Sequence, residues 1–155
     1  MGTTMLGVGP AVAVGGAASG QVRMRVWSLG AGVRVVTSPA AEVEGDARLG
    51  TTLAAGELAA CGHDGVVSLC VLGLAGALWA RSEQIAVPRT DSGLFVAPGG
   101  RLGVALPLVG ALAMVGQAEV LFPIWGPSAK VDDVEVWRVA PFAGGASAGV
   151  QVDFP

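Results

Sequence analysis

The chain has 155 residues, a formal net charge of −3, 52% hydrophobic residues and only 14% charged residues. Soluble domains usually carry roughly 25% charged residues, so much of this protein's surface must consist of apolar or small groups. The arginines are scattered from Arg23 to Arg138, and Lys130 is the single lysine, so no basic patch is available for a phosphate backbone. This composition excludes nucleic acid as an expected partner and is compatible with one domain that buries a single core.

The first 20 residues are uncharged and rich in glycine. A secretory signal needs a positively charged start before its apolar segment, and this stretch has no early lysine or arginine. We expect residues 1–20 to form an N-terminal arm or an edge strand.

Residues 21–29 alternate with a period of two, which predicts a β-strand. The two faces are Val22, Met24 and Val26 on one side and Arg23, Arg25 and Trp27 on the other. Gly30 and Gly32 predict a turn into a second strand that ends at Pro39. Three acidic residues between 42 and 46 then predict an exposed loop or edge hairpin.

Residues 51–65 predict a pair of strands that turns at Ala55 and Gly56, with a short helix over residues 53–60 as the alternative. Two later stretches, 65–80 and 102–118, carry no charge. A helix that crosses a bilayer takes about 20 apolar residues, and glycines break both stretches into pieces of strand length. We expect strands here, with another tight turn near residues 98–101.

About nine to eleven short strands, spaced by about ten residues, favour an all-β fold, an antiparallel β-sandwich or jelly roll. We expect the sandwich to cover residues 21–141, as one unit or as two sub-sandwiches split near residues 81–91. Residues 142–155 are rich in glycine and alanine and are expected to form a C-terminal arm.

Cys61 and Cys70 flank a turn-like stretch that contains the single histidine, His63. The two cysteines could form a disulfide across a hairpin in an oxidising compartment, but two free buried thiols are the commoner arrangement and the one we expect. Zinc would need a fourth ligand and closer cysteine spacing, so we interpret His63 as a turn residue. Without a catalytic motif, we expect a protein that is not an enzyme.

Residues 131–139 predict a strand that contains Asp132 and Asp133. Alternation turns Asp133 and Trp137 outward and Asp132 toward the core, where a carboxylate needs compensation. A structural calcium ion would supply it. The alternative is that Asp132 belongs to the preceding turn and caps backbone amides there, with no metal. No other cofactor is expected.

This last strand, the apolar strand at 119–125 and the stretch SGLFVAPGGRLGVALPLVG at 92–110 together resemble the closing strands of galactose-binding-like β-jelly-roll modules. Such modules occur as carbohydrate-binding modules and on phage virion accessory and decoration proteins. The resemblance implies a sandwich fold and a calcium ligand at Asp132 or Asp133. Because tyrosine is absent and the surface is apolar, it favours the virion branch over glycan binding.

We therefore expect a non-enzymatic virion structural protein, a capsid decoration or tail accessory protein that assembles through apolar faces and terminal arms. Its expected partners are copies of itself and the major capsid or tail protein, and a membrane is not the expected partner. One alternative is a carbohydrate-binding module that stacks sugars on Trp137, Trp125 or Trp79. A second alternative is a membrane-associated protein.

Overall fold

The computed structural model describes residues 1–42, 48–83, 90–131 and 134–153. Within these residues every regular element is a β-strand, and no helix is long and apolar enough to cross a membrane. The strands are β1 (Gly2–Leu6), β2 (Ala13–Met24), β3 (Trp27–Glu42), β4 (Arg48–Asp64), β5 (Val67–Glu83), β6 (Thr90–Pro107), β7 (Leu112–Leu121), β8 (Ser128–Val131), β9 (Val134–Arg138) and β10 (Ala143–Val152).

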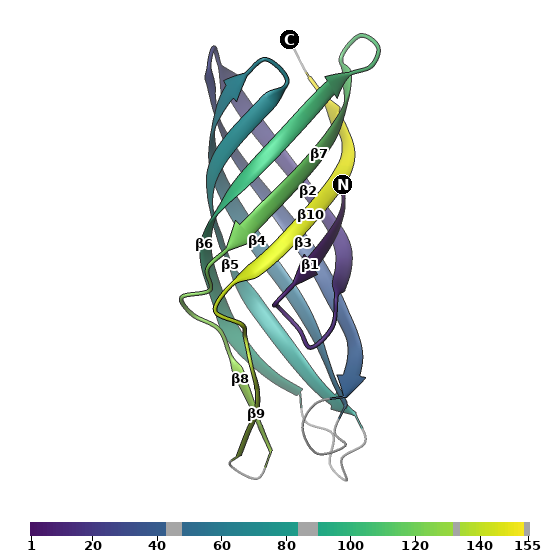
Figure 1. Cartoon of the computed structure of the whole chain (residues 1–155), viewed down its shortest axis with the longest axis vertical. Helices are drawn as coiled ribbons and strands as arrows, with labels where there is room; N and C mark the ends of the chain where they lie inside the picture. The colour runs from purple at the N-terminus through teal and green to yellow at the C-terminus, as the bar shows by residue number, and fades with distance from the viewer. Residues whose placement is uncertain (43–47, 84–89, 132–133, 154–155) are drawn as a thin grey trace.

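Eight of these strands close into an antiparallel barrel in the order β1-β10-β7-β6-β5-β4-β3-β2 (Figure 1). Strands β1 to β7 pair in sequence order as hairpins. Strand β7 then pairs with β10, and β10 pairs with β1 from Gly144–Leu6 to Ala148–Gly2 to complete the ring. Closure gives each barrel strand a neighbour on both sides, although the short β1 pairs only with Ala13–Gly16 of β2 and Gly144–Ala148 of β10. Ring closure is the usual way in which an antiparallel sheet reduces its free edges.

The two ends of the barrel differ (Figure 1). At one end, here called the short-turn end, two-residue turns join β2 to β3 and β4 to β5, because Met24 pairs with Trp27 and Asp64 with Val67. At the opposite end, the hairpin end, the separate two-stranded β8–β9 sheet projects beyond the barrel. Strand β10 ends near the short-turn end, where its Val152 pairs with Leu112 of β7.

The predicted all-β antiparallel class is confirmed, but the sandwich or jelly roll is wrong, because the sheet closes on itself. The sandwich prediction was wrong because glycines were interpreted as turns. The turns expected at Gly30 and Gly32, at Ala55 and Gly56, and near residues 98–101 lie inside β3, β4 and β6, which run on without interruption. Conversely, residues 21–29 contain a turn between Met24 and Trp27, where a continuous strand was expected.

Some of these glycines serve close packing inside the barrel. A Cβ on Gly99 would overlap the carbonyl oxygen of Val120, and one on Gly76 would overlap that of Ala54. Both glycines occupy inward positions in long strands that bend around a narrow barrel, where a neighbouring backbone approaches closely. Glycine here permits curvature and does not mark a chain reversal.

The segments expected to be arms belong to the barrel. Residues 1–20 contribute β1 and most of β2, and residues 142–155 contribute β10. Strands from both sides of residues 81–91 belong to the same ring.

Candidate functional site

Four charged side chains meet inside the barrel: Arg34 of β3, Glu57 of β4, Arg101 of β6 and Glu119 of β7. In each strand the alternation of buried and exposed positions turns these residues inward. Strands β3 and β7 lie opposite each other in the closed sheet, so the cluster crosses the full width of the lumen. We call these four residues the charge ring.

Each arginine in the charge ring contacts both glutamates. Arg101 donates to Glu57 through Nη1 and Nη2 at 3.0 and 2.8 Å, and to Glu119 through Nε and Nη2 at 3.0 and 2.9 Å. Arg34 donates from Nη2 to Glu57 at 2.7 Å and to Glu119 at 3.0 Å, and its Nη1 also contacts Glu119. Such forked contacts suit the planar guanidinium group, so two positive and two negative charges neutralise one another.

The charge ring is almost completely shielded from solvent, with side-chain exposures between 3% and 7%. Burying an ion costs several kcal/mol, and only close partners offset that cost. Within the described residues, the Nε of Arg34 is the buried side-chain nitrogen or oxygen without a hydrogen-bond partner. The ring is therefore a nearly saturated network that ties four strands together across the lumen.

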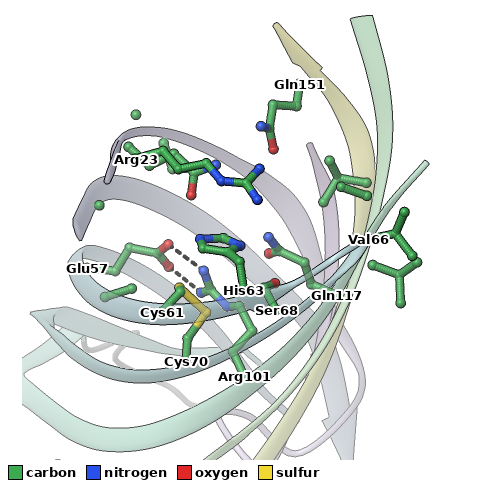
Figure 2. Close-up of a pocket in the computed structure, with 18 of the residues that line it drawn as sticks. Arg23, Glu57, Cys61, His63, Val66, Ser68, Cys70, Arg101, Gln117 and Gln151 are labelled. Atoms are coloured by element: carbon green, nitrogen blue, oxygen red, sulfur yellow. Dashed lines mark hydrogen bonds and ion pairs between the residues drawn. A yellow bond between two sulfur atoms is a disulfide. The ribbon is translucent and has the colours of Figure 1, made fainter. Parts of the chain in front are cut away.

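Between the charge ring and the short-turn end lies a polar cavity of about 70 Å³, here called the lumen chamber (Figure 2). Its floor contains Glu57 and Arg101, and its walls carry Arg23, His63 and Gln117 among other polar side chains. A volume of this size holds a few water molecules, and the lining offers them several hydrogen-bond partners. The chamber is thus suited to water and not to an organic substrate.

His63 lies near the end of β4, and its ring faces the lumen chamber (Figure 2), so its interpretation as a turn residue is wrong. Its Nε2 lies 2.7 Å from Oγ of Ser28, which in turn lies 3.4 Å from Oε1 of Gln21. A serine and a histidine at this distance can act as nucleophile and base. Ser28 is 0% exposed, however, so a substrate carbonyl cannot reach it, and we assign the pair to satisfying buried polar groups.

Cys61 and Cys70 form a disulfide beside the lumen chamber. They are direct partners in the β4–β5 register, which places both side chains on the inward face. The expected free thiols are therefore wrong, and the disulfide alternative is the one observed. With both sulfurs joined, the cysteines do not serve with His63 as zinc ligands.

On the hairpin side of the charge ring, the lumen is filled by apolar side chains. The largest of these fully buried residues are Phe95, Met5, Leu53, Leu74, Leu78 and Leu121. Trp137 of β9 packs against both this core and the small cluster formed by Leu49 and Ala80. Within the described residues, the charge ring and this core occupy the lumen between the lumen chamber and the hairpin end.

The outer face has the opposite character. Each of the eight barrel strands exposes large apolar side chains, for example Leu6, Val22, Val33, Leu58, Leu69, Leu102, Met114 and Val150. Along β5, the outward positions from Val67 to Trp79 carry no charge, and the first outward charge is Arg81. The described outward charges lie near strand ends, as with Arg48 and Asp64 of β4.

The three tryptophans that were predicted to stack sugars do not form one surface. Trp79 and Trp125 are exposed, at 38% and 65%, but lie on different parts of the chain, β5 and the segment after β7. Trp137 was expected to face outward and instead packs against the interior clusters. Trp27 is also exposed and lies at the start of β3.

Asp132 and Asp133, the predicted calcium ligands, lie outside the described residues. The strand expected through them is replaced by β8, which ends at Val131, and β9, which begins at Val134. In the described part of the chain, no group of three or more histidine, cysteine or acidic residues is placed to hold a metal ion. The calcium site remains a prediction.

The charge ring was also missed from the sequence. Its four members are isolated single charges in apolar strands, separated by between 18 and 85 residues for the pairs in contact. The available signal was that each is a single charge inside a strand whose other charges, where it has any, lie near its ends. No family model matches the chain, and no curated protein or solved structure matches it either.

Proposed function

We propose that this chain is an integral membrane β-barrel. Its eight-stranded ring lies in the bilayer as a structural anchor and holds the β8–β9 hairpin outside the membrane. The observation that carries the proposal is the segregation of charge. Between the strand ends, the described charged side chains turn inward and the outward positions are apolar or small. This is the alternation expected when lipid surrounds a barrel and polar groups line its interior.

The dimensions of the apolar surface fit a bilayer. The stretch from Val67 to Trp79 is about 40 Å long at the usual rise of about 3.3 Å per residue. Tilted by about 40°, as strands in such barrels are, it covers roughly 30 Å along the barrel axis. The hydrocarbon core of a bilayer is also about 30 Å thick.

The flanking side chains agree with this placement. Trp27 lies at the β2–β3 turn of the short-turn end, Trp79 lies near the opposite end of β5, and both are exposed. Tryptophan prefers the two boundaries of a membrane, where its ring meets both lipid and water. The Cys61–Cys70 disulfide supports an oxidising compartment, such as a periplasm or the cell exterior.

The filled interior of the barrel supports a role as a membrane anchor and not as an open channel. The charge ring and the apolar core fill the lumen between the lumen chamber and the hairpin end. Small eight-stranded barrels commonly have room only for their own side chains. The surface available to a partner is then the hairpin end with β8 and β9.

Virion assembly stays a prediction from the sequence. An apolar surface can also be covered by neighbouring proteins, as a capsid or tail would provide. Protein neighbours usually cover patches, whereas here every barrel strand contributes exposed apolar side chains around the full circumference. An apolar surface that surrounds the whole barrel favours lipid, because a fluid covers every side. We therefore rank a membrane above a virion as the surroundings of this protein.

Two measurements test the membrane proposal. In lysate from the source, we expect the protein to sediment with membranes, resist an alkaline wash and require detergent for release. In vesicles of brominated phosphatidylcholine, we expect variants that retain only Trp27 or only Trp79 to lose most of their fluorescence. A variant that retains only Trp137 is the matched control, because this side chain packs in the interior, and its fluorescence should fall far less.

Release without detergent, or fluorescence of Trp27 and Trp79 that brominated lipid leaves unchanged, would contradict the proposal. Sedimentation with megadalton protein particles that contain no lipid would instead support the virion prediction.

A further inference from the structure

A second cavity, of about 570 Å³, opens on the outer face near the hairpin end, between β3, β4 and β5. We call it the interfacial notch. The side chains that turn outward into it are Thr37, Pro39, Thr52, Trp79 and Arg81, and Gly50 leaves part of its wall without a side chain. A register shift in the β3–β4 pairing between Ser38 and Ala41 disturbs the sheet at this point. Bulges of this kind often re-aim side chains at functional places.

The lining of the interfacial notch is suited to an anion. Arg81 is exposed and lines the notch, and the described residues that line it include no carboxylate. Among the described residues, Arg81 has no ion pair or hydrogen bond. The hydroxyl groups of Thr37 and Thr52 hydrogen-bond to each other at 3.4 Å, so one donates to the other and the second still has its proton to donate to an acceptor in the notch. A guanidinium group with nearby hydroxyls is a common donor set for phosphate.

The position of the notch identifies the source of that phosphate. Trp79 ends the uncharged outer face of β5, and Arg81 is the next outward residue. In the proposed membrane placement, this is the level where lipid headgroups begin. The outward neighbours on the bilayer side are Ala54 of β4 and Ala77 of β5, which are apolar and do not obstruct an acyl chain.

We propose that the interfacial notch binds the phosphate of a membrane phospholipid, with Arg81 and the hydroxyl pair of Thr37 and Thr52 as donors and Trp79 beside the glycerol region. This inference rests on the proposed membrane function. It goes beyond it because a barrel can be embedded in lipid without holding any lipid at a defined place.

The test uses the full chain in detergent micelles, to which phosphatidylglycerol is added while bound lipid is counted by native mass spectrometry. We expect Arg81→Gln to weaken phosphatidylglycerol binding by about tenfold or more, because a hydrogen bond to a charged group is lost. Arg48→Gln is the matched control, since Arg48 is also an exposed arginine near the hairpin end but does not line the notch. It should leave binding unchanged.

Two further measurements distinguish the possible results. Inorganic phosphate at millimolar concentration should not displace phosphatidylglycerol, because the acyl chains contribute to binding. Displacement by inorganic phosphate would overturn the assignment of the notch to a lipid. The double variant Thr37→Val and Thr52→Val keeps the shape and should weaken binding severalfold. Equal binding by Arg81→Gln and Arg48→Gln overturns the site while the membrane proposal stands. A protein that does not enter bilayers at all overturns both.

Discussion

The inner and outer faces of this barrel are made by the same strands and differ in nearly every respect. On β4, inward positions include Glu57, Cys61 and His63, whereas the outward positions between Arg48 and Asp64 are glycine, threonine, alanine and leucine. In a water-soluble protein the two faces would be exchanged, with charge outside and apolar groups inside. Alternation alone therefore predicts a strand. Which of its two faces belongs to the core depends on the solvent that surrounds the protein.

The largest expected effect comes from breaking the charge ring. Glu57→Leu leaves Arg34 and Arg101 with Glu119 as their shared carboxylate, so an uncompensated buried charge remains. We expect the free energy of unfolding to fall by about 3–5 kcal/mol. Urea titration of the protein in detergent micelles, followed by circular dichroism, measures this change.

The matched control replaces the whole ring with apolar residues of similar size, as Arg34→Met, Glu57→Leu, Arg101→Met and Glu119→Leu together. Removing both partners of buried ion pairs is often neutral or stabilising, so this variant should be more stable than Glu57→Leu alone. A fall of less than about 1 kcal/mol in the free energy of unfolding of Glu57→Leu would contradict the burial of these charges. It would mean that the inward charges are hydrated and interact only weakly.

Placing a charge on the outer face should have the next largest effect. Val71→Arg puts an arginine near the middle of the uncharged stretch of β5, and we expect it to cost about 2–4 kcal/mol in lipid. Val67→Arg, on the same strand and face but at its short-turn end, should cost at most about 1 kcal/mol. Unfolding by urea from lipid vesicles measures both values.

The same pair distinguishes lipid from water. Both valines are exposed, at 69% and 41%, and in water an arginine at either position would change stability by no more than about 0.5 kcal/mol. Equal and small effects at Val71 and Val67 would therefore count against a membrane around β5.

The sequence predicted the strands better than their arrangement. Period-two alternation holds in residues 21–24, before the turn at Met24–Trp27, but its apolar members, Val22 and Met24, face outward and Arg23 faces the lumen chamber. Low overall charge indicated an apolar surface, and that surface is observed. No local pattern says what covers such a surface, so the expectation of protein neighbours was an assumption about the solvent.

Strand length was the second source of error. Strands of 16–18 residues, as in β3 to β6, are far longer than the five or six residues typical of globular proteins. Glycines within them were therefore interpreted as turns, which divided a meander of long hairpins into short sandwich strands. Contacts such as Arg34 with Glu119 depend on closure of the ring, which is a property of the whole chain.

The smallest expected effect concerns the turns that set which residues face inward. A shift of one residue at a two-residue hairpin turn would exchange the two faces of a strand, so turn geometry supports the segregation of charge. Arg25 in the β2–β3 turn has a φ of 45°, in the left-handed region, whereas the β4–β5 turn has Gly65 there with a φ of 58°. Glycine adopts this conformation without the steric cost that arginine incurs.

We therefore expect Arg25→Gly to raise the free energy of unfolding by about 0.5–1 kcal/mol and Gly65→Ala to lower it by a similar amount. A Cβ on Gly65 would meet no atom within 4 Å, so backbone conformation alone accounts for the second change. Parallel urea titrations of the two variants measure both effects. Opposite signs would show that the left-handed residue limits both turns. A loss of stability in Arg25→Gly would show instead that the arginine side chain stabilises the short-turn end, and that its charge at this rim contributes to the difference between the two faces.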